Sequence, residues 1–462
     1  MYKNQSKFGH AVIIGGSIGG LLTARVLSGY FNHVTLLERD AVSHTHPEAR
    51  KGQPQARHLH GLLATGREVM TRYFPDLPQA LVDNGAVVGD FAQTMQWYML
   101  GGYRKNFTMG VPSTTMSRPL LEFLIRERVL ALPNVLLRDN CSVRQLLTSA
   151  NKQRITGVEV VQSHDNKLAE TIPADLIVDC TGRGSRTPGW LAALGYTAPP
   201  VSEVKVNVGY ATRIFRRDPA DLRGKKWFLI TPDAPRETRF GGIFPIEGDR
   251  WICSLGGWIG DHTPLDAAAF LAFARSLPAS DIYDIIVNAE PLSEIVPHKF
   301  PSSLRRHYEK LHRFPEGYLV LGDAISSFNP TYGQGMTSAA LQAVELDDLL
   351  AKSKTLDGLA HVFFKRAAKV IDIPWQLAVG EDFRFAETTG PKPFGTDLIN
   401  RYVTKVHRAT LHDEVVGLAF LKVMNLMAPP PSLFHPKILW RVLWGNNGRL
   451  QATNTLQPAV GD

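Results

Sequence analysis

The chain is poor in cysteine and in long apolar stretches. It has three cysteines among 462 residues, and Cys141, Cys180 and Cys253 lie far apart in the sequence. Such spacing excludes a disulfide framework and a paired-cysteine metal site, and it is typical of proteins in a reducing compartment. No apolar run reaches the roughly 20 residues that span a bilayer, and no leader with charged, apolar and small-residue parts opens the chain. We therefore expect a cytoplasmic protein without a transmembrane segment.

Charge is not concentrated as a nucleic-acid-binding protein requires. The formal net charge is +8, but lysines and arginines are spread along the sequence rather than gathered with aromatics into a basic patch. The C-terminal end is the exception, because residues 401–462 hold seven Lys or Arg against three Asp or Glu. Apolar segments at 418–421 and 439–444 flank three consecutive prolines there, and we expect helices that pack on the parent domain. The alternative is weak contact with a membrane surface.

Metal-ligand spacing is missing as well. His58 and His60 are two residues apart, but no further Cys, Asp or Glu stands at the spacing of a metal site. We expect no metal, and an extended segment whose two histidines face the same side.

The chain does contain two ordered glycine signatures. The first begins with an apolar strand at residues 11–14, continues through a glycine-rich turn at 15–20, and is followed by Glu38 at the end of a second apolar segment. A strand, a glycine turn, a helix start and an acid about 20 residues on are the parts of a dinucleotide-binding fingerprint, although Ser17 replaces its second glycine. We expect nucleotide contacts from Gly15, Gly16, Ser17, Ile18, Gly19, Gly20, Glu38 and the adjacent Arg39.

The second signature lies about 300 residues downstream. An apolar strand at residues 318–321 runs into a Gly-Asp pair, and another glycine-containing turn at 330–336 precedes a helix. Like the first, this arrangement offers backbone N–H groups and the positive end of a helix dipole to an anion.

The two signatures in this order resemble those of flavoprotein monooxygenases of the aromatic hydroxylase and epoxidase group, which hold FAD between them. The resemblance implies an α/β fold with a Rossmann-like FAD-binding domain, an interleaved β-rich substrate domain and a helical C-terminal segment. It also implies that Asp323 binds the FAD ribitol and that backbone N–H groups of the second turn reach the isoalloxazine edge. The FAD contacts implied for this half of the site are Gly322, Asp323, Pro330, Gly333, Gln334, Gly335 and Met336.

Three further segments are similar to the same group. Ser117-Arg118-Pro119 has the sequence of a capped helix start, and the resemblance implies that Arg118 reaches FAD. The loop at residues 50–60 resembles that of bacterial flavin epoxidases of polyether biosynthesis. In related hydroxylases an arginine of this loop contacts the FAD pyrophosphate, which implies that role for Arg57. Thr181-Gly182 stands where aromatic hydroxylases usually have Asp-Gly. Electrons are expected from NAD(P)H, either directly or through a separate flavin reductase.

The order of these patterns predicts an FAD-binding domain in two parts, a β-rich insert between them, and helices at the end. The regions are residues 1–190 (FAD-binding, first part, with a substrate-side insert at about 60–112), 191–312 (substrate domain), 313–360 (FAD-binding, second part) and 361–462 (helical region). Within the substrate domain we expect a hairpin with its turn at 247–249 and an alanine-rich helix at 266–277.

The resemblance implies a monooxygenase that inserts one oxygen atom from O₂ into its substrate by way of a flavin C4a-hydroperoxide. Large apolar side chains are frequent in the substrate domain, which suits a bulky apolar natural product and either alkene epoxidation or ring hydroxylation. Tyr210 and Arg213 are the expected pocket residues, and the sequence identifies no catalytic base. Two alternatives stay open: a non-oxidising FAD-containing cyclase or binding protein, and a flavin-dependent halogenase, whose Trp-x-Trp-x-Ile-Pro segment the chain lacks.

Overall fold

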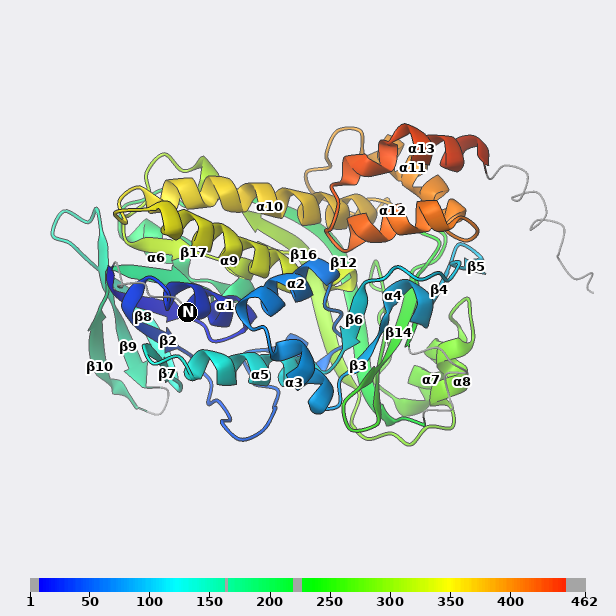
Figure 1. The fold of residues 1–462 in the computed structure, drawn as a ribbon, viewed down its shortest axis with the longest axis horizontal. Coiled ribbons are helices and arrows are strands. Elements are labelled where there is room, and N and C mark those ends of the chain that lie inside the picture. Colours follow the sequence, from blue (N-terminus) through cyan, green and yellow to red (C-terminus); the bar gives the residue numbers. More distant parts are fainter. Residues whose placement is uncertain (1–7, 163–164, 219–226, 446–462) are drawn as a thin grey trace, which may run out of the picture.

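The computed structural model describes residues 8–162, 165–218 and 227–445 (Figure 1). Its first domain is built on five parallel strands: β1 (Phe8–Ile14), β2 (Phe31–Leu37), β7 (Val135–Arg138), β11 (Leu176–Asp179) and β17 (Tyr318–Val320). Their order in the sheet is β17-β11-β1-β2-β7. Strand β17 comes after the whole substrate domain in the sequence, yet it pairs directly with β11. The strand that precedes the second glycine signature therefore belongs to the same sheet as the strand that precedes the first signature.

Burial explains the apolar runs in strands β1, β11 and β17. Ala11, Val12 and Ile13 in β1 are all 0% exposed, although consecutive side chains point to opposite faces of a sheet. Helices α1 (Ile18–Leu27) and α5 (Arg118–Leu130) pack on the sheet, and α9 (Gly335–Lys352) packs on α1. A three-stranded antiparallel sheet also contacts β2 and β11; its strands are β8 (Cys141–Thr148), β9 (Ile155–Gln162) and β10 (Asp165–Pro173).

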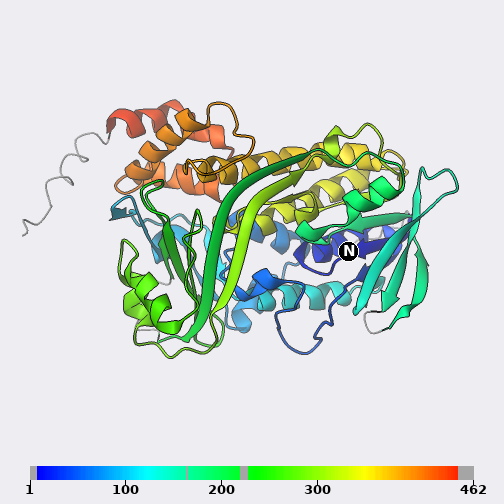
Figure 2. The same cartoon turned by 180° about the vertical axis from the view of Figure 1, so that it is seen from behind.

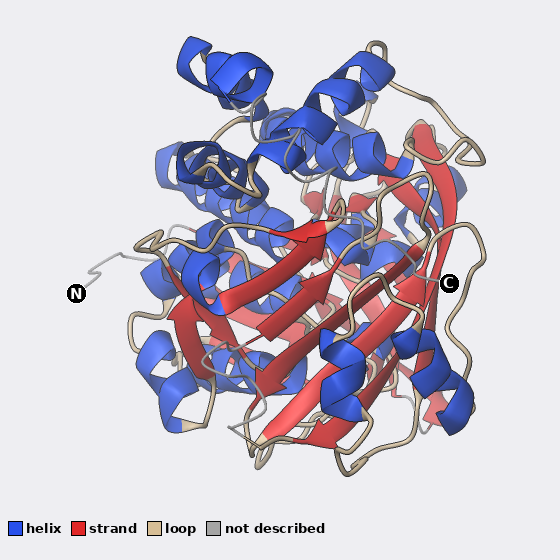
Figure 3. Ribbon diagram, turned by 90° about the vertical axis from the view of Figure 1, so that its right-hand side faces the viewer, coloured by secondary structure: helices blue, strands red, loops and turns tan. Residues whose placement is uncertain are grey.

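The second domain is an eight-stranded, largely antiparallel sheet. Its strands, in spatial order, are β18 (Ser326–Ser327), β16 (Val296–Arg306), β12 (Val201–Arg216), β15 (Arg250–Gly257), β14 (Arg239–Ile246), β13 (Trp227–Ile230), β4 (Met95–Met99) and β5 (Gly102–Tyr103). The long strands β12 and β16 run side by side across the molecule (Figure 2), and Figure 3 shows the strands lengthwise, side by side, from another direction. Strand β4 pairs in parallel with β13. The predicted substrate-side insert at about residues 60–112, which contains β4, therefore contributes to the substrate sheet.

Two local predictions in this domain are confirmed. Strands β14 and β15 form the expected hairpin, and Gly248 and Asp249 in its turn have φ of +73° and +48°. Helix α7 (Ala267–Arg275) follows Asp266, whose carboxylate accepts the Ala269 N–H at 2.9 Å as an N-cap. Together with α8 (Asp281–Ile286), this helix covers one face of the sheet around the fully buried Phe270.

The C-terminal part is helical and consists of α10 (Leu359–Asp382), α11 (Thr396–Ala409), α12 (Glu414–Met424) and α13 (Pro436–Trp440), followed by a π turn at Arg441–Gly445. The last helices pack around a small apolar cluster of their own that includes Val406, Val416 and Val442. They lie at the end of the molecule that holds the substrate sheet (Figure 1). Residues 446–462 of the predicted helical region lie outside the described residues. None of the helices in the described ranges has the length and apolarity needed to cross a membrane.

Short elements connect these layers. They are α2 (Ala64–Tyr73), α3 (Leu77–Asp83), α4 (Phe91–Thr94), α6 (Thr187–Ala193), β3 (Val87–Asp90) and β6 (Pro112–Thr115), with 3-10 turns at Pro54–Arg57, Gly182–Gly184, Tyr308–Lys310, Gly322–Ala324, Pro330–Tyr332 and Pro430–Phe434. The architecture confirms the predicted fold class: a Rossmann-like α/β domain, an interleaved β-rich domain and C-terminal helices.

Candidate cofactor and active site

The two glycine signatures come together at the carboxyl edge of the parallel sheet. Helix α1 begins at Ile18 after the turn that follows β1, and α9 begins at Gly335 after the turns that follow β17. The helices pack side by side, since a Cβ on Gly19 of α1 would lie 3.9 Å from the Cβ of Ala339 in α9. Two helix N-termini, each with unpaired backbone N–H groups and a positive dipole end, therefore lie at the same edge.

Gly15 and Gly20 make the first turn sterically possible. Gly15 has φ +104°, and a Cβ there would lie 2.7 Å from the carbonyl oxygen of Cys180. A Cβ on Gly20 would lie 1.8 Å from the carbonyl oxygen of Gly15. Ser17 takes the place of the second fingerprint glycine, and its hydroxyl donates to Glu122 in α5 at 3.0 Å. The serine thus adds a polar link from the turn to α5.

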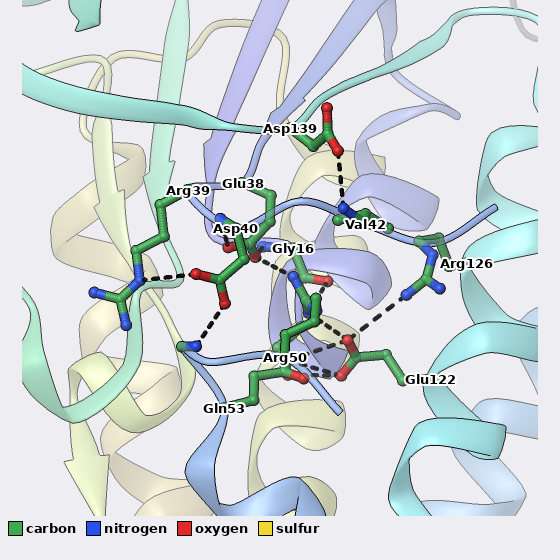
Figure 4. A network of polar contacts seen from close by, with 12 residues as sticks. Gly16, Glu38, Arg39, Asp40, Val42, Arg50, Gln53, Glu122, Arg126 and Asp139 are labelled. Atoms are coloured by element: carbon green, nitrogen blue, oxygen red, sulfur yellow. Dashed lines mark hydrogen bonds and ion pairs between the residues drawn. The ribbon is translucent and has the colours of Figure 1, made fainter. Parts of the chain in front are cut away.

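Glu38, the acid predicted to bind a ribose, is held by a buried arginine (Figure 4). Its Oε2 accepts the Gly16 N–H at 2.9 Å and lies 2.7 Å from Nη1 of Arg50, while its Oε1 accepts the Asp40 N–H at 3.0 Å. Burial alone would raise the pKa of Glu38, but Arg50 and the two N–H donors bring the pKa below its ordinary value. Glu38 is therefore an ionised, positioned acceptor.

Arg50 also binds a second buried acid, Glu122 of α5 (Figure 4). Arg50 is 5% exposed and Glu122 is 3% exposed. Glu122 further accepts from Nε2 of Gln53 at 2.9 Å and lies 3.6 Å from Nε of Arg118. Arg118 donates in turn to the Ser17 hydroxyl at 3.0 Å. This network fixes the loop at residues 50–53 against the first glycine turn.

The loop thus contributes Arg50 to this region, a residue that no sequence pattern indicated. Arg57 is exposed at the end of the 3-10 turn, between Ala56 and His58, which are 4% and 1% exposed. The Arg57 side chain is therefore in contact with solvent. The Arg39 side chain is 66% exposed and lies 4.0 Å from Asp40, at the outer edge of this network (Figure 4).

Asp323 provides the acid of the second signature. Its Oδ1 would lie 3.8 Å from a Cβ on Gly335, so it stands at the N-terminus of α9. The side chain is accessible, yet the surrounding protein raises its pKa, while Arg118 and Arg183 act to lower it. Arg183 is itself fixed by the carbonyl oxygen of Ser302 in β16 at 2.7 Å. An accessible carboxylate between two arginines and a helix N-terminus is suited to bind ligand hydroxyl groups.

The Thr181-Gly182 pair forms a turn around a different aspartate. Asp179, which ends β11 and is 0% exposed, accepts the Thr181 N–H at 2.9 Å. Its other oxygen accepts the hydroxyls of Ser185 and Thr187, both at 2.5 Å. Because both of its oxygens are engaged inside the protein, Asp179 holds the turn and does not replace the missing aspartate of the Asp-Gly pattern.

The two predicted pocket residues lie on opposite faces of the substrate sheet. In β12, Ala211 and Phe215 pack into the cluster under α7 and α8, so Arg213 between them shares that face. Tyr210 points the other way, into an aromatic cluster that also contacts Tyr332 of the second signature. Side chains three residues apart in a strand lie on opposite faces, so Tyr210 and Arg213 cannot line one pocket together as predicted.

His58 reaches the same aromatic cluster from the loop before α2. Its ring centroid lies 5.0 Å from that of Tyr210 and 5.2 Å from that of His298. The loop lies beside the second signature, since a Cβ on Gly333 would be 4.0 Å from the carbonyl oxygen of Gly61. Burial, together with the neighbouring His298, lowers the pKa of His58 to about 3. The imidazole is therefore neutral at physiological pH.

A chain of hydrogen bonds indicates the tautomer of His58. The Leu59 N–H donates to Oγ of Ser254 at 3.3 Å. The Ser254 hydroxyl can then donate to Oγ1 of Thr212 at 2.6 Å. The Thr212 hydroxyl in turn donates to Nδ1 of His58 at 2.8 Å. The reverse direction would leave the Ser254 hydroxyl without an acceptor. Nε2 of His58 then carries the proton, and within the described ranges this buried atom has no hydrogen-bond partner.

A buried acid joins the second signature, the substrate sheet and the C-terminal helices. Asp382 ends α10 and is 0% exposed. Its Oδ1 accepts from Nδ2 of Asn329 at 2.8 Å, the hydroxyl of Tyr332 at 2.9 Å and Nε1 of Trp258 at 3.5 Å. Oδ2 has no hydrogen-bond partner in the described part of the chain. Burial raises the pKa of Asp382 to about 7 despite these donors, so the acid retains its proton up to neutral pH.

Replacing Asp382 by asparagine should remove a pH dependence from the stability of the protein. Because the fold raises the pKa of Asp382 from 3.8 to about 7, the stabilisation by the protonated acid is complete below about pH 4 and is lost as the pH rises through 7. Asparagine keeps the acceptor oxygen and cannot ionise. Between about pH 4 and 7, the free energy of unfolding of the wild type, relative to that of Asp382→Asn, should fall by about 1.4 kcal/mol per pH unit. Denaturant unfolding measures both values.

The control for this measurement is Asp372→Asn, also in α10. The Asp372 side chain is 48% exposed, in contrast to the fully buried Asp382, so this variant controls for the loss of a carboxylate from the same helix. Parallel profiles for the wild type and Asp382→Asn would contradict the assignment.

The polar atoms around the second signature fit a bound FAD. Oε1 of Gln334, Oγ1 of Thr337 and Nε2 of His58 are buried and have no hydrogen-bond partner among the residues that the structure describes. Buried polar atoms without a hydrogen-bond partner lower the stability of a protein unless a ligand or a water molecule bonds to them. Two helix N-termini match a pyrophosphate, the accessible carboxylate of Asp323 matches ribityl hydroxyls, and the aromatic cluster matches a planar ring system. The residues present therefore fit this cofactor.

Comparison with known proteins agrees with the fold. No protein-family model matches the chain. Protein Rv3254 of Mycobacterium tuberculosis (strain ATCC 25618 / H37Rv) is 35% identical over 398 residues, which cover 82% of this chain and 81% of that protein. The structure of pqsL, a probable FAD-dependent monooxygenase from Pseudomonas aeruginosa, is similar with a TM-score of 0.58 and 16% identity, covering 82% of this chain and 98% of that one. The flavin-dependent brominase Bmp2 is similar with a TM-score of 0.62 and 13% identity, covering 97% of this chain and 100% of that one. The architecture is thus the one that FAD-dependent monooxygenases and halogenases use.

Proposed function

The chain belongs to the same protein family as Rv3254 of Mycobacterium tuberculosis, and from the site described above we propose that it is an FAD-dependent monooxygenase acting on a bulky apolar substrate. The observation that carries this proposal is the meeting of two helix N-termini, Arg118 and Asp323 at the carboxyl edge of a parallel sheet, beside an aromatic cluster of the substrate sheet. Nucleotide-binding chemistry and an apolar chamber lie next to each other there, as oxygen transfer requires.

The cofactor would be held by both halves of the site. Glu38 would accept the ribose hydroxyls, the first turn (residues 15–20) and Arg118 would bind the pyrophosphate, and Asp323 would bind the ribityl chain. Backbone N–H groups of residues 333–336 would face the isoalloxazine, where the α9 dipole stabilises negative charge. When bound, FAD supplies the reaction with O₂, which no side chain of the protein can provide.

The side chains around the aromatic cluster would position the substrate and exclude water. Tyr210, Phe240 and Trp258 form the apolar wall, with Phe240 and Trp258 ring centroids 4.8 Å apart. The free Nε2–H of His58 would donate a hydrogen bond to an oxygen on the substrate. A neutral histidine with so low a pKa is a weak base, so the site favours a reaction that needs none, such as alkene epoxidation. The epoxidase-like loop at residues 52–58 supports the same choice over ring hydroxylation.

The donor role of His58 can be tested with two apolar probes, 2-naphthol and naphthalene, whose binding is followed by the change in flavin absorbance. One neutral hydrogen bond contributes about 0.5–1.5 kcal/mol, so the wild type should prefer 2-naphthol by roughly 3- to 10-fold. His58→Phe should abolish this preference and leave naphthalene binding nearly unchanged. His58→Asn keeps an N–H donor and should restore part of it, whereas equal preferences in all three proteins would contradict the assignment.

Electron supply should depend on a separate flavin reductase. The chain has no second dinucleotide fingerprint, and the aspartate that could replace the missing Asp-Gly acid, Asp179, is fully engaged inside the fold. We expect slow reduction of the bound flavin by NAD(P)H alone and faster turnover when a flavin reductase is added, followed by stopped-flow absorbance. Rapid, substrate-stimulated oxidation of NADPH by the isolated protein would refute this prediction.

The proposed function is tested first by the oxygen reaction of the flavin. Purified protein loaded with FAD is reduced without oxygen, O₂ is admitted, and the absorbance is recorded with and without added polyenes. A transient spectrum distinct from those of reduced and oxidised flavin is expected. Direct return to the oxidised spectrum with one H₂O₂ per flavin would instead favour the non-oxidising cyclase or binding alternative, and a dependence on bromide or chloride would favour a halogenase.

A further inference from the structure

The C-terminal helices keep many large apolar side chains on their outer surface. Among the described residues, fourteen large apolar side chains are exposed, and seven of them lie in this one region: Phe394, Leu398, Ile399, Met427, Phe434, Trp440 and Trp444. The core of these helices is complete without them, since it is formed by other residues such as Val406, Val416 and Val442. The outer apolar side chains are therefore available for contacts outside the chain.

Part of this surface is continuous. Leu398 is 73% exposed and lies four residues before Tyr402 in α11, so the two side chains are neighbours on one helix face. The Tyr402 ring stacks on Phe434 with centroids 4.6 Å apart, and its hydroxyl donates to the carbonyl oxygen of Leu433 at 2.6 Å. Phe394, just before the helix, is fully exposed. We call Phe394, Leu398, Tyr402 and Phe434 the apolar ridge.

Positive charge flanks the apolar ridge. Arg401, Lys405 and Arg408 are exposed on α11 at spacings of four and three residues, and none of them forms an ion pair within the described ranges. The one acid of this helix, Asp397, is paired with Lys392 at 2.6 Å. Two copies of this surface brought together would place like charges opposite each other, which disfavours self-association. A surface of negative charge that also accepts apolar side chains is the complementary partner.

We propose that the apolar ridge and its flanking cations dock the protein on the surface of an anionic lipid bilayer. The helix would lie in the headgroup region, with the ridge in contact with the acyl chains and the cations in contact with lipid phosphates. Because α11, α12 and α13 lie at the same end of the molecule as the substrate sheet (Figure 1), docking would bring the aromatic cluster close to the phase in which apolar compounds accumulate. The docking does not depend on the proposed oxygenase activity.

The test is sedimentation of the full-length protein with vesicles of phosphatidylcholine alone or mixed with phosphatidylglycerol. Binding is expected only with the anionic vesicles and should weaken at high salt. The double substitution Phe394→Ser/Leu398→Ser should lower the partition coefficient by about 10-fold or more, and Arg401→Gln/Lys405→Gln should lower it by a similar factor. Leu136→Ser and Leu265→Ser are matched controls, since these leucines are 58% and 53% exposed elsewhere on the surface, and should bind as the wild type does.

Equal binding by the wild type and both double variants would overturn the proposal, as would a lack of binding to anionic vesicles. The same proteins are examined by light scattering without lipid. A concentration-dependent dimer that the Phe394→Ser/Leu398→Ser variant cannot form, in the absence of vesicle binding, would show that a second copy covers the ridge. That result would also overturn the proposal.

Discussion

Replacing Arg50 by alanine should both destabilise the protein and abolish tight FAD retention. The substitution leaves Glu38 and Glu122, which are 7% and 3% exposed, without the cation that lies between them. Removing one partner from a buried ion pair typically costs about 3–5 kcal/mol, because the remaining charge stays desolvated and unpaired. Glu38 would also lose the group that keeps its pKa low, and with it the ionised form needed to accept ribose hydroxyls. The measurements are denaturant unfolding and FAD content after gel filtration.

The matched control is Arg57→Ala in the same loop. Because the Arg57 side chain is exposed, this variant should unfold like the wild type and keep its FAD. Arg50→Lys should fall between the two, since lysine restores the charge but cannot contact both carboxylates with a planar fork. If Arg57→Ala lost FAD while Arg50→Ala kept it, the loop arginine inferred from the epoxidase resemblance would be the correct one.

The second large effect is expected for Asp323→Ala, which should weaken FAD binding without destabilising the cofactor-free protein. Loss of a charged hydrogen-bond acceptor costs roughly 1.5–3 kcal/mol, or about 10- to 150-fold in affinity. In the absence of FAD, however, the Asp323 side chain is exposed, and its carboxylate forms no hydrogen bond or ion pair within the described ranges. Removing that charge should leave the free energy of unfolding unchanged.

This separation of the two effects distinguishes a cofactor ligand from a structural residue. FAD affinity is measured by quenching of flavin fluorescence, and stability by unfolding of the cofactor-free protein. Asp348→Ala serves as the control because Asp348 is exposed near the other end of α9. Equal FAD affinity in the Asp323→Ala variant and the wild type would remove Asp323 from the cofactor site, and a loss of stability alone would assign it a structural role.

Much of the fold and of the cofactor site follows from local sequence patterns. The parts of the first signature are close together in the sequence: the strand at 11–14, the turn up to Gly20, and Glu38. Steric limits explain the glycines of the turn, and a hydrogen bond from the Gly16 N–H explains the position of Glu38. The Gly-Asp pair at 322–323 could be placed because an apolar strand precedes it and a helix follows the next turn. The hairpin turn at 247–249 and the helix that begins after Asp266 depend only on neighbouring residues and were predicted for that reason.

The missing parts depend on pairs that are distant in the sequence. Arg50 and Glu122 are 72 residues apart, and nothing near Arg50 indicates that a buried acid from α5 will meet it. Asp382 is the last residue of α10, and the helix sequence does not mark it as a site. Its environment is set by Asn329, Tyr332 and Trp258, which all donate to one of its oxygens in the folded structure. These groups are recognised from burial and from unpartnered atoms, which a sequence does not display.

The predicted pairing of Tyr210 with Arg213 in one pocket conflicts with strand geometry alone. Both residues lie in β12 (Val201–Arg216), and the side-chain period of a strand is two. Tyr210 and Arg213 therefore could not both face the flavin. Thr212 shares the face of Tyr210, and its hydroxyl bonds to His58, which connects that face of the sheet to the loop beside the second signature.

The central claim, that this protein transfers an oxygen atom from O₂ to an apolar substrate, is tested most directly by isotopic oxygen. The FAD-loaded protein is supplied with a flavin reductase, NADPH and a mixture of candidate polyenes under ¹⁸O₂, and the products are analysed by mass spectrometry. We predict a product that is heavier by one ¹⁸O atom, with an epoxide as the expected form. A product that carries oxygen only from water, or that forms equally well without O₂, would contradict the claim.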